Sequence, residues 1–77
     1  MGAGRARRGL ATHAGIKPRE IEILQLLEQS MPNKRIALTL NTTLETVKWN
    51  LKNIFAKLGV PSRYDAMMVA RKRGLID

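Results

Sequence analysis

Residues 33–60 read NKRIALTLNTTLETVKWNLKNIFAKLGV, and their pattern predicts two helices joined by a short turn. Apolar residues recur every three or four positions in its second half, at Val47, Leu51, Ile54 and Leu58. At roughly 100° per residue, these side chains fall on one face of a helix. The spacing therefore predicts a long helix over residues 44–58 whose apolar face lies in a core.

A shorter helix is predicted over residues 33–40, where Ile36, Ala37 and Leu40 are apolar. The polar residues 41–43 form a tight turn between the two helices, and Thr43 can cap the second one with its hydroxyl. In a helix-turn-helix, the second helix enters the major groove of DNA while the first braces it against the backbone. The sequence thus predicts a helix-turn-helix whose recognition helix spans residues 44–58.

One further helix is predicted on each side of this pair. Pro18 suits the first position of a helix that continues to about Gln29. After the long helix, Gly59 suits the left-handed residue that closes a helix, and Ser62 followed by Asp65 resembles a capping box that opens a fourth helix. We expect an all-α domain over residues 16–77, a four-helix bundle with a central helix-turn-helix.

Residues 1–15 contain four glycines, three arginines and little apolar periodicity. They are interpreted as a flexible basic arm, an inter-domain linker or a remnant of cloning. The arginines, Arg5, Arg7 and Arg8, are typical of a solvated tail, although such a cluster can also assist DNA binding. The single histidine, His13, lies in this arm, which argues against a metal-binding or general-base role.

The composition narrows the class of function. A chain of 77 residues has room for one small domain, and without cysteine it can form neither disulfides nor thiolate metal sites, which suits a reducing cytosol. Fourteen Lys and Arg against six Asp and Glu give a formal charge of +8, which favours a polyanionic partner such as nucleic acid or an anionic membrane surface. No apolar run approaches the roughly 20 residues of a membrane span, so we expect a soluble cytoplasmic protein without a membrane partner.

Enzymatic function is not expected. The sequence contains no nucleophile with a base at a credible spacing, no Gly-rich phosphate loop and no cluster of metal ligands. We therefore expect no catalytic residues, no cofactor and no metal ion.

The outward face of the long helix is the predicted DNA-reading surface. Glu45, Lys48, Trp49 and Lys52 lie about 100° to 200° from Val47 on the helical wheel. Lysines can donate hydrogen bonds to guanine O6 and N7, and a large apolar side chain can contact a thymine methyl group. The alternatives are that the lysines form an ordinary solvated surface and that Trp49 packs against a neighbouring helix or a further domain.

Residues 16–77 resemble the DNA-binding domain of the LuxR type, which is shared with NarL and FixJ-type response regulators and MalT-like activators. The resemblance rests on Pro18-Arg19-Glu20, Asn33-Lys34 followed by Ile36-Ala37, the stretch TVKWNLKNIFAKLGV at 46–60, and Ser62-Arg63 with Ala66. It implies the output domain of a bacterial transcriptional regulator, which usually ends a longer chain and binds duplex DNA sequence-specifically.

The resemblance also implies roles for individual residues. Base contacts are expected from Lys48, Trp49 and Lys52, and phosphate contacts near Asn33, Lys34, Thr43, Thr46 and Lys57. Homodimerisation on DNA is expected through the fourth helix, with RNA polymerase as a candidate further partner. At the centre of that helix, Met67 and Met68 point about 100° apart, so both cannot face one small core and one is expected to face a partner.

Three positions depart from the family pattern. Lys17 stands where the family usually has a capping Thr, and Pro32 where it usually has Ser, so each helix start loses a side-chain cap worth about 1 kcal/mol. Trp49 replaces a smaller, commonly β-branched residue, so the operator sequence does not follow from relatives.

Two other functions stay open: the promoter-reading domain of a sigma factor, which the junction at residues 59–63 disfavours, and a protein-interaction module.

Overall fold

The computed structural model describes residues 15–77. This part of the chain folds into four α-helices without a β-strand: α2 (Pro18–Glu28), α3 (Asn33–Thr39), α4 (Leu44–Leu58) and α5 (Arg63–Lys72). The predicted all-α class is confirmed, and each helix boundary that the sequence analysis gives lies within two residues of the observed one. The predicted arm at residues 1–15 lies outside the described residues, with the exception of Gly15. None of the four helices is both long enough and apolar enough to cross a membrane.

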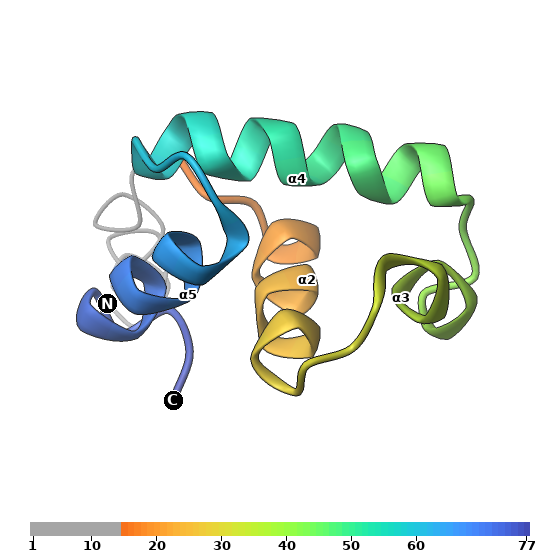
Figure 1. Cartoon of the computed structure of the whole chain (residues 1–77), viewed down its shortest axis with the longest axis horizontal. Coiled ribbons are helices and arrows are strands. Elements are labelled where there is room, and N and C mark those ends of the chain that lie inside the picture. Colours follow the sequence, from red (N-terminus) through yellow and green to blue (C-terminus); the bar gives the residue numbers. More distant parts are fainter. Residues whose placement is uncertain (1–14) are drawn as a thin grey trace, which may run out of the picture.

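Helix α4 is the element against which the other three pack. Figure 1 shows it running along one edge of the molecule, with α3 near its N-terminal end, α2 below its middle and α5 near its C-terminal end. Its predicted apolar stripe is buried, as are apolar side chains of the facing helices, among them Ile23, Leu24, Leu27 and Ile36. Burial of one face fixes which side of α4 remains available to a partner.

Both ends of α4 are closed as the sequence predicts. The Thr43 side chain accepts a hydrogen bond from the backbone N–H of Thr46, at 3.1 Å. At the other end Gly59 adopts a left-handed conformation with φ of 69°, a region that penalises residues with a Cβ atom. The recognition helix therefore has fixed limits at Leu44 and Leu58.

The start of α5 resembles the predicted capping box but differs in one bond. Ser62 Oγ accepts from the backbone N–H of Asp65 at 3.3 Å, as in a capping box. The Asp65 carboxylate accepts from the Ser62 hydroxyl at 2.9 Å, where a Glu would accept from the Ser62 backbone N–H. The shorter Asp side chain accounts for this difference.

Helices α2 and α3 both begin without a side-chain cap, and at α2 another hydrogen bond partly replaces it. Neither Lys17 nor Pro32 makes a side-chain capping bond, as predicted. At α2 the loss is partly offset, because Glu20 Oε1 accepts from the Lys17 backbone N–H at 2.8 Å. This interaction is the second half of a capping box and needs no side-chain acceptor at residue 17.

Three core residues lie outside the helices. Ile16 precedes α2, and Leu75 and Ile76 follow α5; all three are buried with the core. The Leu75 backbone N–H donates to the Ala70 carbonyl at 2.8 Å, which turns the chain back toward the core. Helical periodicity did not identify these residues because they belong to no helix.

Candidate nucleic-acid interface

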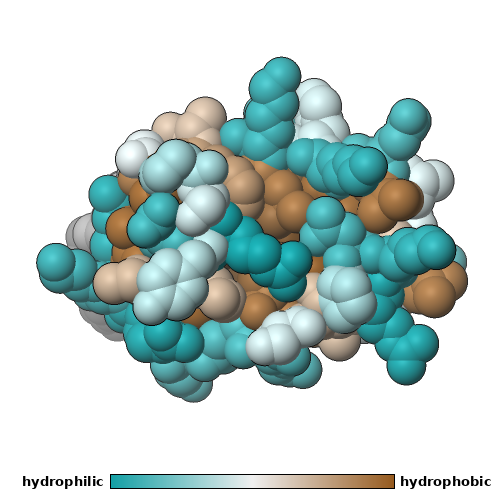
Figure 2. Space-filling model, in the orientation of Figure 1, coloured by the Kyte–Doolittle hydropathy of each residue, from teal (hydrophilic) through white to brown (hydrophobic). Residues whose placement is uncertain are grey.

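The side of α4 opposite its buried stripe is exposed. Trp49 is 64% exposed, and Lys48 and Lys52 on the same side are also exposed. The prediction that Trp49 faces solvent in the free domain is confirmed, and the alternative that it packs against a neighbouring helix is not seen among residues 15–77. In Figure 2, hydrophilic side chains project from the edge of the molecule along which α4 runs. A large indole beside two lysines is thus available to a partner.

A shallow depression lies at the N-terminal end of this face. It is lined by Thr43, Glu45, Thr46, Lys48 and Trp49. The Thr43 hydroxyl donates to Thr46 Oγ1 at 2.9 Å while accepting from the Thr46 backbone N–H, so the two threonines are held together. The depression combines a helix N-terminus, which attracts phosphate, with a cation, a carboxylate and an aromatic side chain, which can contact base edges.

The predicted phosphate-contacting residues of α3 lie at its start. Lys34 is exposed, whereas Asn33 is half-buried and its Oδ1 is buried without a hydrogen-bond partner among the described residues. A phosphate accepts hydrogen bonds and cannot satisfy Oδ1. Any phosphate contact from Asn33 therefore has to come from its Nδ2 or from its backbone N–H at the start of α3.

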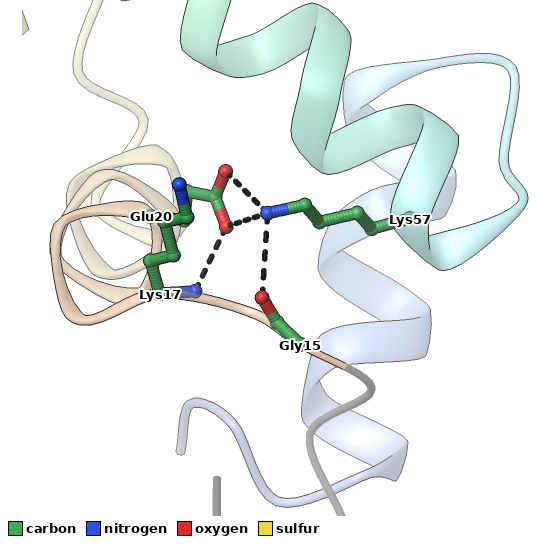
Figure 3. Close-up of polar contacts among 4 residues, drawn as sticks. All are labelled: Gly15, Lys17, Glu20 and Lys57. Carbon is green, nitrogen blue, oxygen red and sulfur yellow. Dashed lines mark hydrogen bonds and ion pairs between the residues drawn. The ribbon is translucent and has the colours of Figure 1, made fainter. Parts of the chain in front are cut away.

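Lys57 lies in a different environment from the other predicted phosphate contacts. Its Nζ donates to both carboxylate oxygens of Glu20, at 2.9 and 3.0 Å, and to the carbonyl oxygen of Gly15 at 3.3 Å. Figure 3 shows the ammonium group pointing from α4 toward the start of α2. The Glu20 side chain is only 3% exposed and that of Lys57 29%. The Lys57 ammonium group is thus already paired inside the domain, whereas a lysine that binds phosphate would be unpaired in the absence of DNA.

Glu20 is a residue whose role the sequence analysis missed. It appeared there only as part of the motif that opens the first helix, yet it lies three, four and seven positions before Ile23, Leu24 and Leu27. That spacing puts the carboxylate on the buried face of α2. An acid in an apolar stripe signals a buried partner, and Lys57 is that partner.

Helix α5 separates its two central methionines. Met67 is half-buried and packs against the core, whereas Met68 is 51% exposed. The expectation that only one of them faces the core is confirmed. Tyr64, one turn before Met68, is also exposed, so α5 carries an apolar stripe of two residues on its surface.

A short helix packed on a longer one, with a basic outward face on the second, defines a helix-turn-helix DNA-binding domain. Residues 16–70 match the model of the family described as bacterial regulatory proteins, luxR family. The chain belongs to this family, and it contains the DNA-binding domain by which the family is defined.

Similar proteins agree with this assignment. The transcriptional regulator AlkS of Alcanivorax borkumensis is 43% identical over 65 residues, which cover 84% of this chain and 8% of AlkS. Among solved structures, the response regulator ChrA of a heme-sensing two-component system aligns with a TM-score of 0.78 and 46% identity, over 79% of this chain and 30% of ChrA. The transcription factor GerE aligns with a TM-score of 0.77 and 33% identity, over 79% of this chain and 91% of GerE. The chain therefore spans a small part of AlkS and ChrA and nearly the whole of GerE.

Proposed function

We propose that this chain is the output domain of a bacterial transcriptional regulator and places α4 in the major groove of an operator duplex. The exposed face of Lys48, Trp49 and Lys52, opposite the buried stripe of the same helix, carries this proposal. Because α3 and the core hold the other face, α4 can enter a groove without unfolding. AlkS, ChrA and GerE, whose names describe regulators of this kind, support it. A regulator of this kind works in the cytoplasm, where bacterial DNA lies.

Within this interface, Lys48, Trp49 and Lys52 contact base edges. Lysines donate to guanine O6 and N7, and the indole contacts a thymine methyl group or the edge of a neighbouring base. Thr43 and Thr46 contact phosphate at the start of α4, where the helix dipole favours an anion, and Lys34 and Asn33 contact phosphate from α3.

Lys57 acts as a positioning residue. To reach a phosphate, its ammonium group would have to leave a carboxylate that is 3% exposed, and an unpaired buried charge is strongly unfavourable. Its contacts instead hold the C-terminal part of α4 against α2 and against Gly15. This assignment takes the place of the phosphate contact that the resemblance implied for Lys57.

The domain pairs on DNA through α5. Tyr64 and Met68 give α5 an exposed apolar stripe, and Met67 lies at its border with the core. So small an area suits a weak dimer that forms when two half-sites lie on one duplex.

Sedimentation of the chain alone should show a monomer or a weak dimer at micromolar concentration. A Met68→Glu variant should bind a single half-site normally and lose cooperative binding to a paired site.

A second candidate function is contact with another protein. Leu38, at 73%, is the most exposed large apolar side chain of the described residues, and Figure 2 shows hydrophobic surface at the end of the molecule where α3 lies. RNA polymerase or a sensor domain is the candidate partner. On this reading DNA affinity is incidental and the domain acts as an interaction module.

Selection of bound duplexes from a random pool, combined with a salt titration, tests both functions. A reader of the major groove should enrich a defined sequence, and log K should fall with log salt with a slope of about −0.9 for each phosphate that a lysine or arginine neutralises. A shallow salt dependence without an enriched sequence would contradict the DNA-reading function and favour the interaction module.

A further inference from the structure

The basic face of α4 carries one acidic side chain, Glu45. Residues 33–58 contain five Lys and Arg and no other acid. The other three glutamates of the described chain, Glu20, Glu22 and Glu28, are all in ion pairs. Glu45 makes neither an ion pair nor a side-chain hydrogen bond to residues 15–77. Its carboxylate is thus free for a partner.

Glu45 lies on the surface proposed to read DNA. It precedes Trp49 by four residues and Lys52 by seven, so the three side chains form one stripe along α4. It is exposed and lines the same shallow depression as Lys48 and Trp49. Residues near the N-terminus of a recognition helix contact the base edges, and Glu45 lies in the first turn of α4. If α4 enters the groove as proposed, Glu45 enters with it.

The chemistry of a carboxylate selects one base. Ionised Glu45 has acceptors and no donor, and in the major groove only cytosine N4 and adenine N6 offer donors. On adenine, the N7 acceptor beside N6 repels a carboxylate. Guanine presents the acceptors O6 and N7 and thymine the acceptor O4, so neither base can donate a hydrogen bond to Glu45. The phosphates repel the Glu45 carboxylate as well, which leaves cytosine N4 as its favoured partner.

We propose that Glu45 determines specificity by accepting a hydrogen bond from N4 of a cytosine in the operator. This inference rests on the proposed placement of α4 in the major groove. The competing role is purely structural, an acid in the first turn that stabilises the helix dipole. Thr43 already caps this helix, and a structural role leaves base preference unchanged.

The test is selection from a random duplex pool with the 77-residue chain, repeated with Glu45→Gln and Glu45→Ala. The unaltered chain should enrich cytosine at one position of each half-site. Glu45→Ala should lose that preference and bind random duplex more tightly, because it removes a like charge. Glu45→Gln should change the preference from cytosine to adenine, since glutamine pairs with adenine N6 and N7. Discrimination at that base pair should change by about 5- to 150-fold.

The matched control is Glu22→Gln, which removes the same charge from α2, away from the interface. It should leave the enriched sequence unchanged. Identical enriched sequences for the unaltered chain and both Glu45 variants would overturn the proposal. If Lys52→Ala changes the enriched sequence and the Glu45 variants do not, the inference fails while the DNA-reading face stands. If none of these variants changes it, the proposed face itself is wrong.

Discussion

Replacing Lys57 by methionine should destabilise the domain far more than the loss of an ordinary surface lysine. Methionine keeps most of the length and apolar stem of the side chain and removes only the ammonium group. Among residues 15–77, the Glu20 carboxylate, 3% exposed, is then left with the Lys17 backbone N–H as its remaining hydrogen-bond donor. The buried charge loses its counter-ion, which is the situation in which a broken ion pair costs most.

The magnitude follows from the burial of the two partners. Removing one member of a fully buried pair costs about 3–5 kcal/mol, and exposed pairs are worth at most about 1 kcal/mol. Lys57 is 29% exposed, so water can partly replace its ammonium group, and we expect a loss of about 2–4 kcal/mol. A domain of this size has a free energy of unfolding of roughly 3–9 kcal/mol, so Lys57→Met should lose a large part of it.

Urea unfolding followed by circular dichroism measures this loss, and two further variants identify its cause. Arg71→Met breaks the exposed Arg71–Glu28 pair, 3.3 Å long, and should cost less than about 1 kcal/mol. In the double variant Glu20→Gln, Lys57→Met, no buried charge is left behind, and the Gln can still accept from the Lys17 N–H. It should be more stable than Lys57→Met by about 1–3 kcal/mol.

DNA binding by the double variant separates the positioning role from a phosphate contact. A lysine on a phosphate contributes about one unit to the slope of log K against log salt, so its removal would make the slope shallower by about 0.9. We expect the slope to stay unchanged. A shallower slope, together with a Lys57→Met stability no lower than that of Arg71→Met, would contradict the positioning role and return Lys57 to the phosphate-contacting set.

Four further variants test the interface and its frame. Trp49→Ala should leave the midpoint of thermal unfolding nearly unchanged and lower the affinity for the specific duplex. In the unaltered chain, iodide should quench the indole fluorescence until cognate duplex is added, and an indole that iodide cannot reach would contradict the exposure of Trp49. Lys52→Ala should weaken specific binding by about 1–3 kcal/mol and relax preference at one base pair, whereas equal losses on random duplex would assign Lys52 to phosphate. Thr43→Ala should lower the free energy of unfolding by about 1 kcal/mol through loss of the cap, measured in urea. Gly59→Ala should cost about 1–2 kcal/mol in the same assay because of its φ of 69°, and an unchanged midpoint would count against that conformation.

The features predicted correctly from the sequence depend on residues close together in the chain. The bounds of α4 follow from the Thr43 cap, a regular apolar stripe and Gly59, all within seventeen consecutive residues. The exposure of Trp49 follows from the same stripe, because a side chain opposite a buried face points to solvent. Local periodicity contains this information, and the structure adds only the packing partners.

The contacts that the sequence did not predict join distant segments. Lys57 and Glu20 are 37 residues apart, and Lys57 and Gly15 are 42 apart. Considered alone, Lys57 is one of several lysines on a basic helix, and its spacing cannot show which of them meets a buried acid. The acid in the apolar stripe of α2 is a signal of a buried cation that was not used, and only the packing of α2 against α4 identifies the cation as Lys57.

The two ends of α4 consequently have different tasks. The residues proposed to read DNA, from Glu45 to Lys52, lie within its first nine residues, whereas Lys57 fastens its C-terminal end to Glu20 and to the backbone at Gly15. A helix of fifteen residues is about 22 Å long and behaves as a rod, so the position of one end determines the position of the other. A small tilt at the fastened end displaces the reading side chains relative to the bases. We therefore expect the buried ion pair to contribute to recognition through orientation, although it lies at the end of α4 away from the reading side chains.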